Sequence, residues 1–267
     1  SNTGKGDTDC GAAFTGFTLI DANTDRDLRP LYENAIIDLD DLSTTLLTMR
    51  ADTVGPVQSV KFDVNNGLYT KVENAAPYAL YGDSGGNYGG SGFSPGAYQI
   101  EVTAYSGDNV SGEVLARQQY QTILINSSYE PRLQSVANNL CLQPSGGSSV
   151  WGAPMAQGSC NANAVQKFRI ELASNQHDLV NLINGQNGLC LDIYGAAMSN
   201  NASAIPWGCH NEANQQFRLK GVGSNAFQII ATHSGKCLSL KTDSSYGSEV
   251  VQTTCNQSDA KQLWRLK

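Results

Sequence analysis

Apolar and polar residues alternate along the first half of the chain. Residues 60–64 read Val-Lys-Phe-Asp-Val, and residues 100–104 read Ile-Glu-Val-Thr-Ala. A period of two is typical of strands that bury one face. The glycine-rich stretch 82–96 favours turns, and only one weak helical stripe, at 31–42, interrupts the pattern. This half is therefore predicted to be an all-β domain of about seven strands, a β-sandwich, over residues 12–126.

The second half of the chain repeats itself three times. Cys141, Cys190 and Cys237 recur at intervals of 49 and 47 residues, and each is followed by a leucine. Each repeat ends in Gln-x-aromatic-Arg-aliphatic. These closing segments are 166–170, 215–219 and 262–266. Because no unit of this length can bury an apolar face alone, the three should pack around a common axis as a β-trefoil over residues 129–267, after a polar linker at 126–128. The repeats are assigned to 129–175, 176–222 and 223–267.

Six of the seven cysteines form three pairs separated by 18 or 19 residues. Regular pairs indicate disulfide bonds. Structural zinc, the alternative, needs short spacings of about two to four residues, which this chain does not have. Disulfides indicate an oxidising compartment. Cys10 is left over, either as a free thiol or as a partner for another chain. The expected pairs are Cys141–Cys160, Cys190–Cys209 and Cys237–Cys255.

Charge is spread unevenly between the halves. Of the 267 residues, 15% are charged and 40% are hydrophobic, and the formal net charge is −7. The first 128 residues carry 16 acidic and 7 basic side chains, whereas the rest carry 8 and 10. An acidic chain without clustered Lys and Arg binds phosphate backbones and anionic membranes poorly. We expect no nucleic-acid partner, no membrane insertion, and a flexible tail at residues 1–11.

Three features of the second half resemble one known family. They are the Gln-x-Trp signature at 262–264, the cysteine pair inside each repeat and the Cys-Leu-Asp step at 190–192. Together they resemble the ricin-type (R-type) β-trefoil lectins, also called family 13 carbohydrate-binding modules, over residues 129–267. The resemblance implies a β-trefoil with three intra-repeat disulfides that binds galactose-, N-acetylgalactosamine- or xylose-type glycans. It also implies that the closing aromatic residues fill a shared core. Those residues are Phe168, Phe217 and Trp264.

A sugar site needs an apolar platform, a carboxylate that accepts hydroxyl hydrogen bonds, and amides or imidazole for orientation. The middle repeat holds all three at the offsets of the family's binding repeat. The resemblance implies that Asp192 accepts hydroxyl hydrogen bonds and that Trp207 stacks on the sugar ring. His210 and Asn214 would add polar contacts, and Gln215 either braces the Asp192 loop or contacts the sugar. The other candidates are Ile205 in the pocket wall and Tyr194 beside the platform.

The flanking repeats depart from this pattern. In the first repeat, Gln143 replaces the aspartate and Gly158 replaces the tryptophan. In the third repeat, the corresponding residues are Ser239 and Thr253. The remaining positions hold Asn161 and Val165 in the first repeat and Asn256 in the third. Each candidate in the middle repeat, taken alone, has an ordinary structural explanation, but their joint occurrence predicts one working site there.

Two segments resemble a protease motif and a calcium-binding loop, but each lacks other residues that the function requires. Residues 82–86 read like the segment around a protease nucleophile, Ser84, yet all three histidines follow it in the chain, whereas that protease family has its histidine before the serine. Residues 21–27 imitate a calcium loop, but Arg26 stands where glycine is needed and Tyr32 where the bidentate Glu is needed. We predict turns in both places, with no catalytic residue, no metal and no cofactor.

These patterns predict a secreted, non-catalytic lectin whose partners are oligosaccharides, polysaccharides or glycoproteins, located outside the cell or on its surface. The first half resembles, in pattern alone, the immunoglobulin-like accessory modules of secreted bacterial carbohydrate-active proteins. Two alternatives remain open. The chain could be a structural subunit of an extracellular fibre or surface assembly, self-assembling or cross-linked through Cys10. It could also be the accessory part of a polysaccharide-degrading enzyme.

Overall fold

The structure, a computed structural model, describes residues 13–147, 150–173, 178–242 and 247–267. Cys10 and the predicted tail at 1–11 lie outside the described residues. The chain folds into two compact units. The first comprises Ser1–Glu33, Ser43–Phe93 and Gln99–Tyr120, and the second comprises Asn34–Leu42, Ser94–Tyr98 and Gln121–Lys267. The predicted domain bounds at 126 and 129 stay a prediction.

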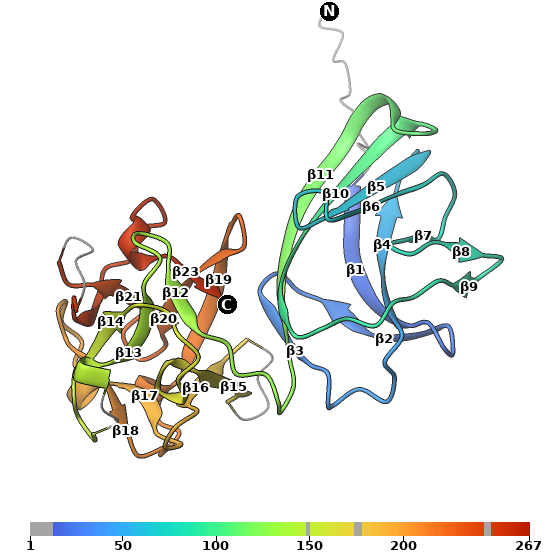
Figure 1. The fold of residues 1–267 in the computed structure, drawn as a ribbon. Coiled ribbons are helices and arrows are strands. Elements are labelled where there is room, and N and C mark those ends of the chain that lie inside the picture. The colour runs from blue at the N-terminus through green and yellow to red at the C-terminus, as the bar shows by residue number, and fades with distance from the viewer. Residues whose placement is uncertain (1–12, 148–149, 174–177, 243–246) are drawn as a thin grey trace, which may run out of the picture. The chain divides into compact units, whose positions relative to one another are not determined.

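Two large β-sheets build the core of the N-terminal half (Figure 1). One has the order β2 (Arg26–Leu31), β1 (Ala13–Asp21), β4 (Leu47–Val54), β7 (Tyr78–Ala79). The other has the order β3 (Ala35–Asp38), β11 (Ser111–Ile125), β10 (Gly96–Gly107), β5 (Ser59–Val64), β6 (Tyr69–Glu73). The rings of Phe17 on β1 and Tyr120 on β11 lie 5.8 Å apart between centroids, so the two sheets share a core. The all-β prediction is confirmed, and the immunoglobulin-like class of this half stays a prediction.

The alternating pattern has its expected cause in β5. Val60, Phe62 and Val64 are buried, whereas the two polar residues between them are half-buried. Phe62 lies opposite Val102 of β10 in the antiparallel register, and both side chains are fully buried. Successive side chains of a strand point to opposite faces, so one face enters the core.

The weak helical stripe at 31–42 does not correspond to a helix. The segment contains strand β3, which pairs in parallel with the end of β11. Ile36 and Ile37 are both buried although they are neighbours in sequence. A strand that is covered on both faces shows consecutive apolar residues, and periodicity alone does not separate such a run from a buried helical turn.

The two imitating motifs are turns, as predicted. Gly85 and Gly86 join the short strands β8 (Asp83–Ser84) and β9 (Asn87–Tyr88) with φ angles of 64° and 88°, which favour glycine. The calcium-like segment is the turn between β1 and β2. The carboxylate of Asp21 accepts the Asn23 N–H at 2.9 Å and the Thr24 hydroxyl at 2.8 Å, and so caps that turn.

Each trefoil repeat supplies four strands (Figure 1). The first repeat contains β12 (Leu133–Ser135), β13 (Cys141–Pro144), β14 (Met155–Gly158) and β15 (Phe168–Leu172). The second contains β16 (Val180–Asn184), β17 (Cys190–Ile193), β18 (Ala204–Trp207) and β19 (Phe217–Gly223). The third contains β20 (Ala226–Ala231), β21 (Cys237–Leu240), β22 (Val250–Thr253) and β23 (Trp264–Leu266).

Strand pairing repeats with the sequence. The second and third strands of every repeat form an antiparallel hairpin: β13 with β14, β17 with β18, and β21 with β22. The last strand of each repeat pairs with the first strand of another: β15 with β16, β19 with β20, and β23 with β12. Because the third pairing returns to the first repeat, the three repeats close on themselves, and the predicted β-trefoil is confirmed.

The core of the trefoil is built from equivalent positions of the three repeats. The closing aromatics Phe168, Phe217 and Trp264 are at most 1% exposed, which confirms that they fill a common core. The leucine after the first cysteine of each repeat joins this core. These leucines are Leu142, Leu191 and Leu238. Side chains alternate along each strand, so the residue after each leucine points away from the core.

In each repeat, one disulfide ties the hairpin to the loop that follows it. The three disulfides join Cys141 to Cys160, Cys190 to Cys209 and Cys237 to Cys255, so the predicted pairing is confirmed.

Helical structure in the described part of the chain is confined to short 3-10 turns, and no helix there is long and apolar enough to span a membrane. The turns are η1 (Ser145–Gly147), η2 (Ala164–Gln166), η3 (Tyr194–Ala196), η4 (Ala213–Gln215) and η5 (Ala260–Gln262).

Candidate functional site

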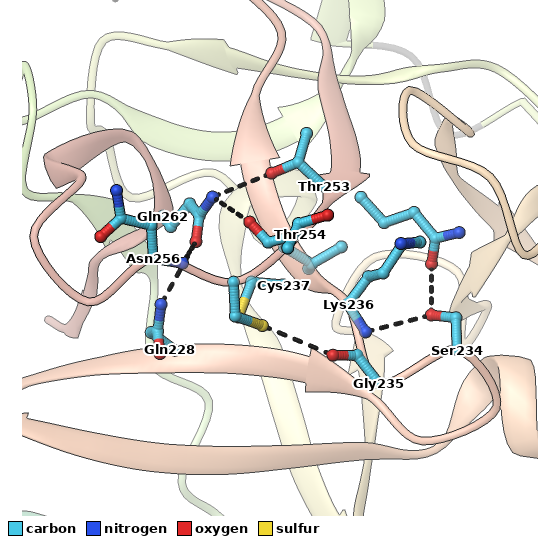
Figure 2. The surroundings of a disulfide bond; sticks show 12 residues. Gln228, Ser234, Gly235, Lys236, Cys237, Thr253, Thr254, Asn256 and Gln262 are labelled. Carbon is cyan, nitrogen blue, oxygen red and sulfur yellow. Dashed lines mark hydrogen bonds between the residues drawn. A yellow bond between two sulfur atoms is a disulfide. The ribbon is translucent and has the colours of Figure 1, made fainter.

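A buried glutamine clamps the loop around the second cysteine of every repeat. The glutamines are Gln166, Gln215 and Gln262, and none is more than 3% exposed. Each Oε1 accepts the N–H of the residue after the cysteine, at 2.8, 2.9 and 2.7 Å. Each Nε2 donates to the carbonyl of the residue before the cysteine, at 2.9, 2.9 and 3.0 Å. Figure 2 shows this arrangement for Gln262 beside Thr254 and Asn256. The same clamp therefore holds the loop in all three repeats, although their loop residues differ.

The hairpin of the middle repeat points its functional side chains away from the core. Asp192 on β17 lies opposite Ile205 on β18, and Trp207 lies two residues further along the same strand. Because side chains alternate, these three share one face of the hairpin. Leu191 and Ile193 share the other face and belong to the trefoil core.

The predicted residues converge on one cavity of about 380 Å³. Its walls are Asp192, Tyr194, Gly195, Ala196, Ile205, Trp207, His210 and Asn214. Six of the seven sequence candidates therefore come together, and the seventh, Gln215, lies behind them. The sequence reasoning missed Gly195 and Ala196. Both belong to the turn η3 and have left-handed φ angles of 63° and 48°, and only the glycine carries a sequence signal for such a turn.

Asp192 is held rigidly at the floor of this cavity, where it is 3% exposed. Its Oδ2 accepts hydrogen bonds from Gln215 Nε2 at 2.8 Å and from Asn214 Nδ2 at 3.0 Å. His210 Nε2 lies 3.3 Å from the same oxygen. Among the described residues, these contacts all reach Oδ2, which leaves Oδ1 open to a hydroxyl donor.

Two opposing effects set the charge of Asp192. Burial raises the pKa of its carboxyl group above the ordinary value, while the hydrogen bonds from Gln215 and Asn214 and the nearby His210 lower it. Burial is the largest of these effects. The carboxylate is thus desolvated by its surroundings but matched by fixed donors, an arrangement that suits directional hydrogen bonding to hydroxyl groups.

The apolar wall consists of Ile205 and Trp207. Ile205 is buried, whereas Trp207 keeps 39% of its surface exposed at the rim. Tyr194 is 64% exposed at the end of the hairpin where η3 begins. A half-exposed indole beside a carboxylate offers an apolar face next to a hydrogen-bond acceptor. A pyranose ring has the matching surfaces, an apolar face of C–H groups and hydroxyl groups at its edge.

The first repeat fills the equivalent space with its own side chain. Gln166 Nε2 donates to Gln143 Oε1 at 2.6 Å, as Gln215 does to Asp192. A Cβ atom placed on Gly158 would lie 2.5 Å from the same Gln143 oxygen, so the glutamine side chain lies directly over the glycine. An aromatic side chain at this position would therefore require Gln143 to move and to break its bond to Gln166.

The third repeat satisfies its polar groups internally. Ser239 is 2% exposed, and its hydroxyl donates to the Leu240 carbonyl at 3.1 Å. The hydroxyl of Thr253, at the tryptophan position, accepts Gln262 Nε2 at 2.9 Å (Figure 2). This repeat lacks both a carboxylate and an aromatic platform at these positions. That a single site works stays a prediction.

A three-repeat trefoil with a carboxylate and an indole in one cavity has the architecture of a carbohydrate-binding lectin domain. Residues 130–264, just over half of the chain, match the family described as the ricin-type beta-trefoil lectin domain. The chain belongs to this family.

Several solved structures are similar to parts of the chain. The designed threefold-symmetric protein ThreeFoil is 28% identical over 51% of this chain and 96% of its own, with a TM-score of 0.49. The Polyporus squamosus lectin, bound to a human-type influenza-binding epitope, is 17% identical over 52% of this chain and 48% of its own, with a TM-score of 0.45. An exo-beta-1,3-galactanase from Clostridium thermocellum is 14% identical over 88% of this chain and 57% of its own, with a TM-score of 0.49. No curated protein matches the chain.

Proposed function

We propose that this protein is a secreted lectin that binds a galactose-, N-acetylgalactosamine- or xylose-type sugar in the cavity of its middle repeat. The observation that carries the proposal is the convergence of Asp192, Trp207, His210 and Asn214 on one cavity of about 380 Å³. Membership of the ricin-type family supports the binding of carbohydrate, and the three disulfides fit an oxidising, extracellular environment.

Each wall of the cavity has one part in binding. Asp192 Oδ1 accepts hydrogen bonds from neighbouring hydroxyl groups, while Oδ2 stays engaged with Asn214 and Gln215. Trp207 packs against the apolar face of the ring, and His210 orients a polar group at the rim. One shallow site of this kind gives an affinity from millimolar to tens of micromolar, or about 4 to 7 kcal/mol. Binding several copies of a glycan at once would raise the avidity.

The protein performs no chemistry in this proposal. The donors around Asp192 hold its carboxylate in place, and the cavity offers a hydroxyl-binding surface rather than a paired acid and base. The N-terminal half, as an immunoglobulin-like sandwich, serves as the accessory module that carries the lectin.

A glycan array tests the proposal. We expect the wild-type protein to bind selectively to galactose-, N-acetylgalactosamine- or xylose-bearing glycans, and an Asp192→Ala, Trp207→Ala double variant to bind none. The matched control is Asn161→Ala, which changes the residue of the first repeat that corresponds to His210. All three proteins should melt cooperatively. If the folded wild type binds no glycan, the lectin proposal is wrong and the structural-subunit alternative takes its place.

A further inference from the structure

An exposed tryptophan from the first repeat lies beside the cavity of the middle repeat. Trp151 is 58% exposed, and its neighbour Val150 is 59% exposed. Its ring centroid lies 5.2 Å from that of Trp207, with the ring planes tilted by 56°. Trp151 does not line the cavity itself. Exposed apolar surface that is contiguous, as here across Val150, Trp151 and Trp207, marks an interaction surface.

The backbone around the two rings is shaped to bring them together. The N–H of Gly152 donates to the Pro206 carbonyl at 2.9 Å, which attaches the Trp151 loop to strand β18. A Cβ atom on Gly208 would lie 2.8 Å from Trp151 Cη2, so the indole packs directly on the glycine backbone. A Cβ on Gly152 would lie 3.4 Å from Trp207. Only a chain without a side chain at Gly208 lets the indole approach this closely.

This contact does not bury Trp151. Its ring packs on Gly208 and against Trp207, yet more than half of its surface stays exposed. A purely structural role would be expected to hide most of the indole, because burying an aromatic side chain is where its stabilising free energy comes from. The hairpin instead holds the ring in a fixed position and leaves an apolar face for something else.

The exposed aromatic side chains follow the length of the binding hairpin. Tyr194 lies at one end of it, where its N–H donates to the Ser203 carbonyl at 3.0 Å. Trp207 ends strand β18, and Trp151 packs on the next residue, Gly208. The chain from residue 203 to residue 208 is extended and spans about 16 Å, at roughly 3.3 Å per residue. The cavity lies between these ends, so the apolar surface continues past the cavity toward the first repeat.

We propose that Trp151 forms a second sugar-stacking position, continuous with the cavity, and that the site therefore recognises an oligosaccharide of at least two residues rather than an isolated monosaccharide. This inference rests on the proposed function of the cavity. The sugar in the cavity bonds to Asp192 and packs on Trp207, and the next sugar of the chain places its apolar face on Trp151. Neutral oligosaccharides suit this second position, because its contacts are an indole face and Val150.

Calorimetric titration with monosaccharides and oligosaccharides tests the inference. The probes are galactose, a galactose-terminated trisaccharide, xylose and xylotriose, each titrated into wild type, Trp151→Ala, Trp151→Phe and Trp207→Ala. In the Trp151→Ala variant we expect the affinity for the preferred oligosaccharide to fall about tenfold, a typical effect of removing one aromatic contact, with monosaccharide affinity unchanged. Trp151→Phe should keep most of the oligosaccharide affinity, and Trp207→Ala should lose both.

Fluorescence gives a second measurement of the same contact. The chain has three tryptophans, and Trp264 is fully buried in the core, so it supplies a constant background. In a Trp207→Phe variant, which keeps a ring in the cavity wall, oligosaccharide but not monosaccharide should shift the emission of Trp151.

The outcomes separate this inference from the proposed function. If wild type binds the oligosaccharide no better than the monosaccharide, or if Trp151→Ala binds both as wild type does, the second position does not exist and the lectin proposal stands. If wild type binds none of these probes and no glycan on the array, both proposals fail.

Discussion

The first and middle repeats of the trefoil share a scaffold and differ in one acceptor. In both, a buried closing glutamine clamps the loop around the second cysteine with bonds of almost the same length. The same Nε2 atom then makes one more bond, to the amide oxygen of Gln143 in the first repeat and to a carboxylate oxygen of Asp192 in the middle repeat. Folding requirements are thus met equally in both repeats.

The two repeats differ in whether the acceptor side chain keeps an oxygen atom free for a ligand. An amide has a single oxygen, and that of Gln143 faces its own clamp and covers Gly158. A carboxylate has two oxygens, and Asp192 satisfies the clamp with Oδ2 while Oδ1 remains for a ligand. One change of functional group therefore turns a structural contact into the floor of a cavity, provided that the facing position carries an aromatic ring.

The largest expected effect comes from removing the clamps one at a time. Gln166→Ala, Gln215→Ala and Gln262→Ala should each lower the free energy of unfolding by about 3 kcal/mol, because each leaves buried backbone groups without partners. Thermal melts measure this loss. Only Gln215→Ala should also lose glycan binding, since only this glutamine holds Asp192. Equal binding losses in all three variants would mean that the clamps act on binding only through global stability.

Replacing Asp192 by asparagine tests the acceptor itself. The substitution keeps the shape of the side chain but removes its charge and one of its two acceptor oxygens. Binding should weaken about 100-fold, as expected when a charged hydrogen bond is lost, with a much smaller change in melting temperature. The matched change is Gln143→Asp in the first repeat, which should create no binding because Gly158 supplies no platform. Binding that survives Asp192→Asn would show that the carboxylate is not the main acceptor.

The pH dependence should separate binding from stability in sign. Burial raises the pKa of Asp192 above 3.8, the value of an unperturbed aspartate. Only the ionised carboxyl keeps Oδ1 as an acceptor for a hydroxyl while Oδ2 accepts from Asn214 and Gln215, so affinity should fall about tenfold for each pH unit below the folded pKa. In the sugar-free protein, the raised pKa stabilises the fold below pH 3.8, and this contribution is lost as the pH rises through the folded pKa.

Calorimetric titration between pH 7 and pH 3 measures the first effect, and melts over the same range measure the second. The Asp192→Asn variant should lose the pH dependence that Asp192 causes, whereas His210→Ala should keep it. A profile that disappears in His210→Ala and persists in Asp192→Asn would assign the titration to the histidine and contradict the prediction.

The trefoil and most of its candidate site could be predicted because they depend on relations inside a repeat. The spacing of Cys190 and Cys209 fixes a hairpin and its loop, so residues at set offsets from them must converge. Trp151 could not be found in this way, since it approaches the site from another repeat and no offset inside the middle repeat reports it. Ala196 could not be predicted because its φ angle is left-handed, a conformation that is uncommon for alanine and that the residue type does not indicate.

The N-terminal half had no such internal reference. Alternation predicted its strands, as at Phe62, but it could not recognise β3, whose Ile36 and Ile37 are both buried. The alternation within one strand predicts which of its faces is buried, but it does not predict which strands lie beside it in the sheet. Repeats supply that missing information three times over, and this is why the second half could be predicted in more detail than the first.

The smallest expected effect, at His210, sharpens the comparison among repeats. Its ring nitrogen lies 3.3 Å from Asp192 Oδ2 and its side chain is 37% exposed, so His210→Ala should weaken binding only about threefold, as for partly exposed charged contacts. The clamp uses the backbone N–H of His210, which the substitution keeps, and besides the contact with Asp192 only the 3.3 Å bond from the Glu212 N–H to His210 Nδ1 is lost, so stability should change little. Asn161→Ala and Asn256→Ala are the matched changes in the flanking repeats, and titration with the best glycan should find their affinities equal to wild type. A loss of affinity at Asn256→Ala with no fall in melting temperature would place a second site in the third repeat, because the backbone clamp stays intact and the substitution removes only the bond from the Ser258 N–H to Asn256 Oδ1.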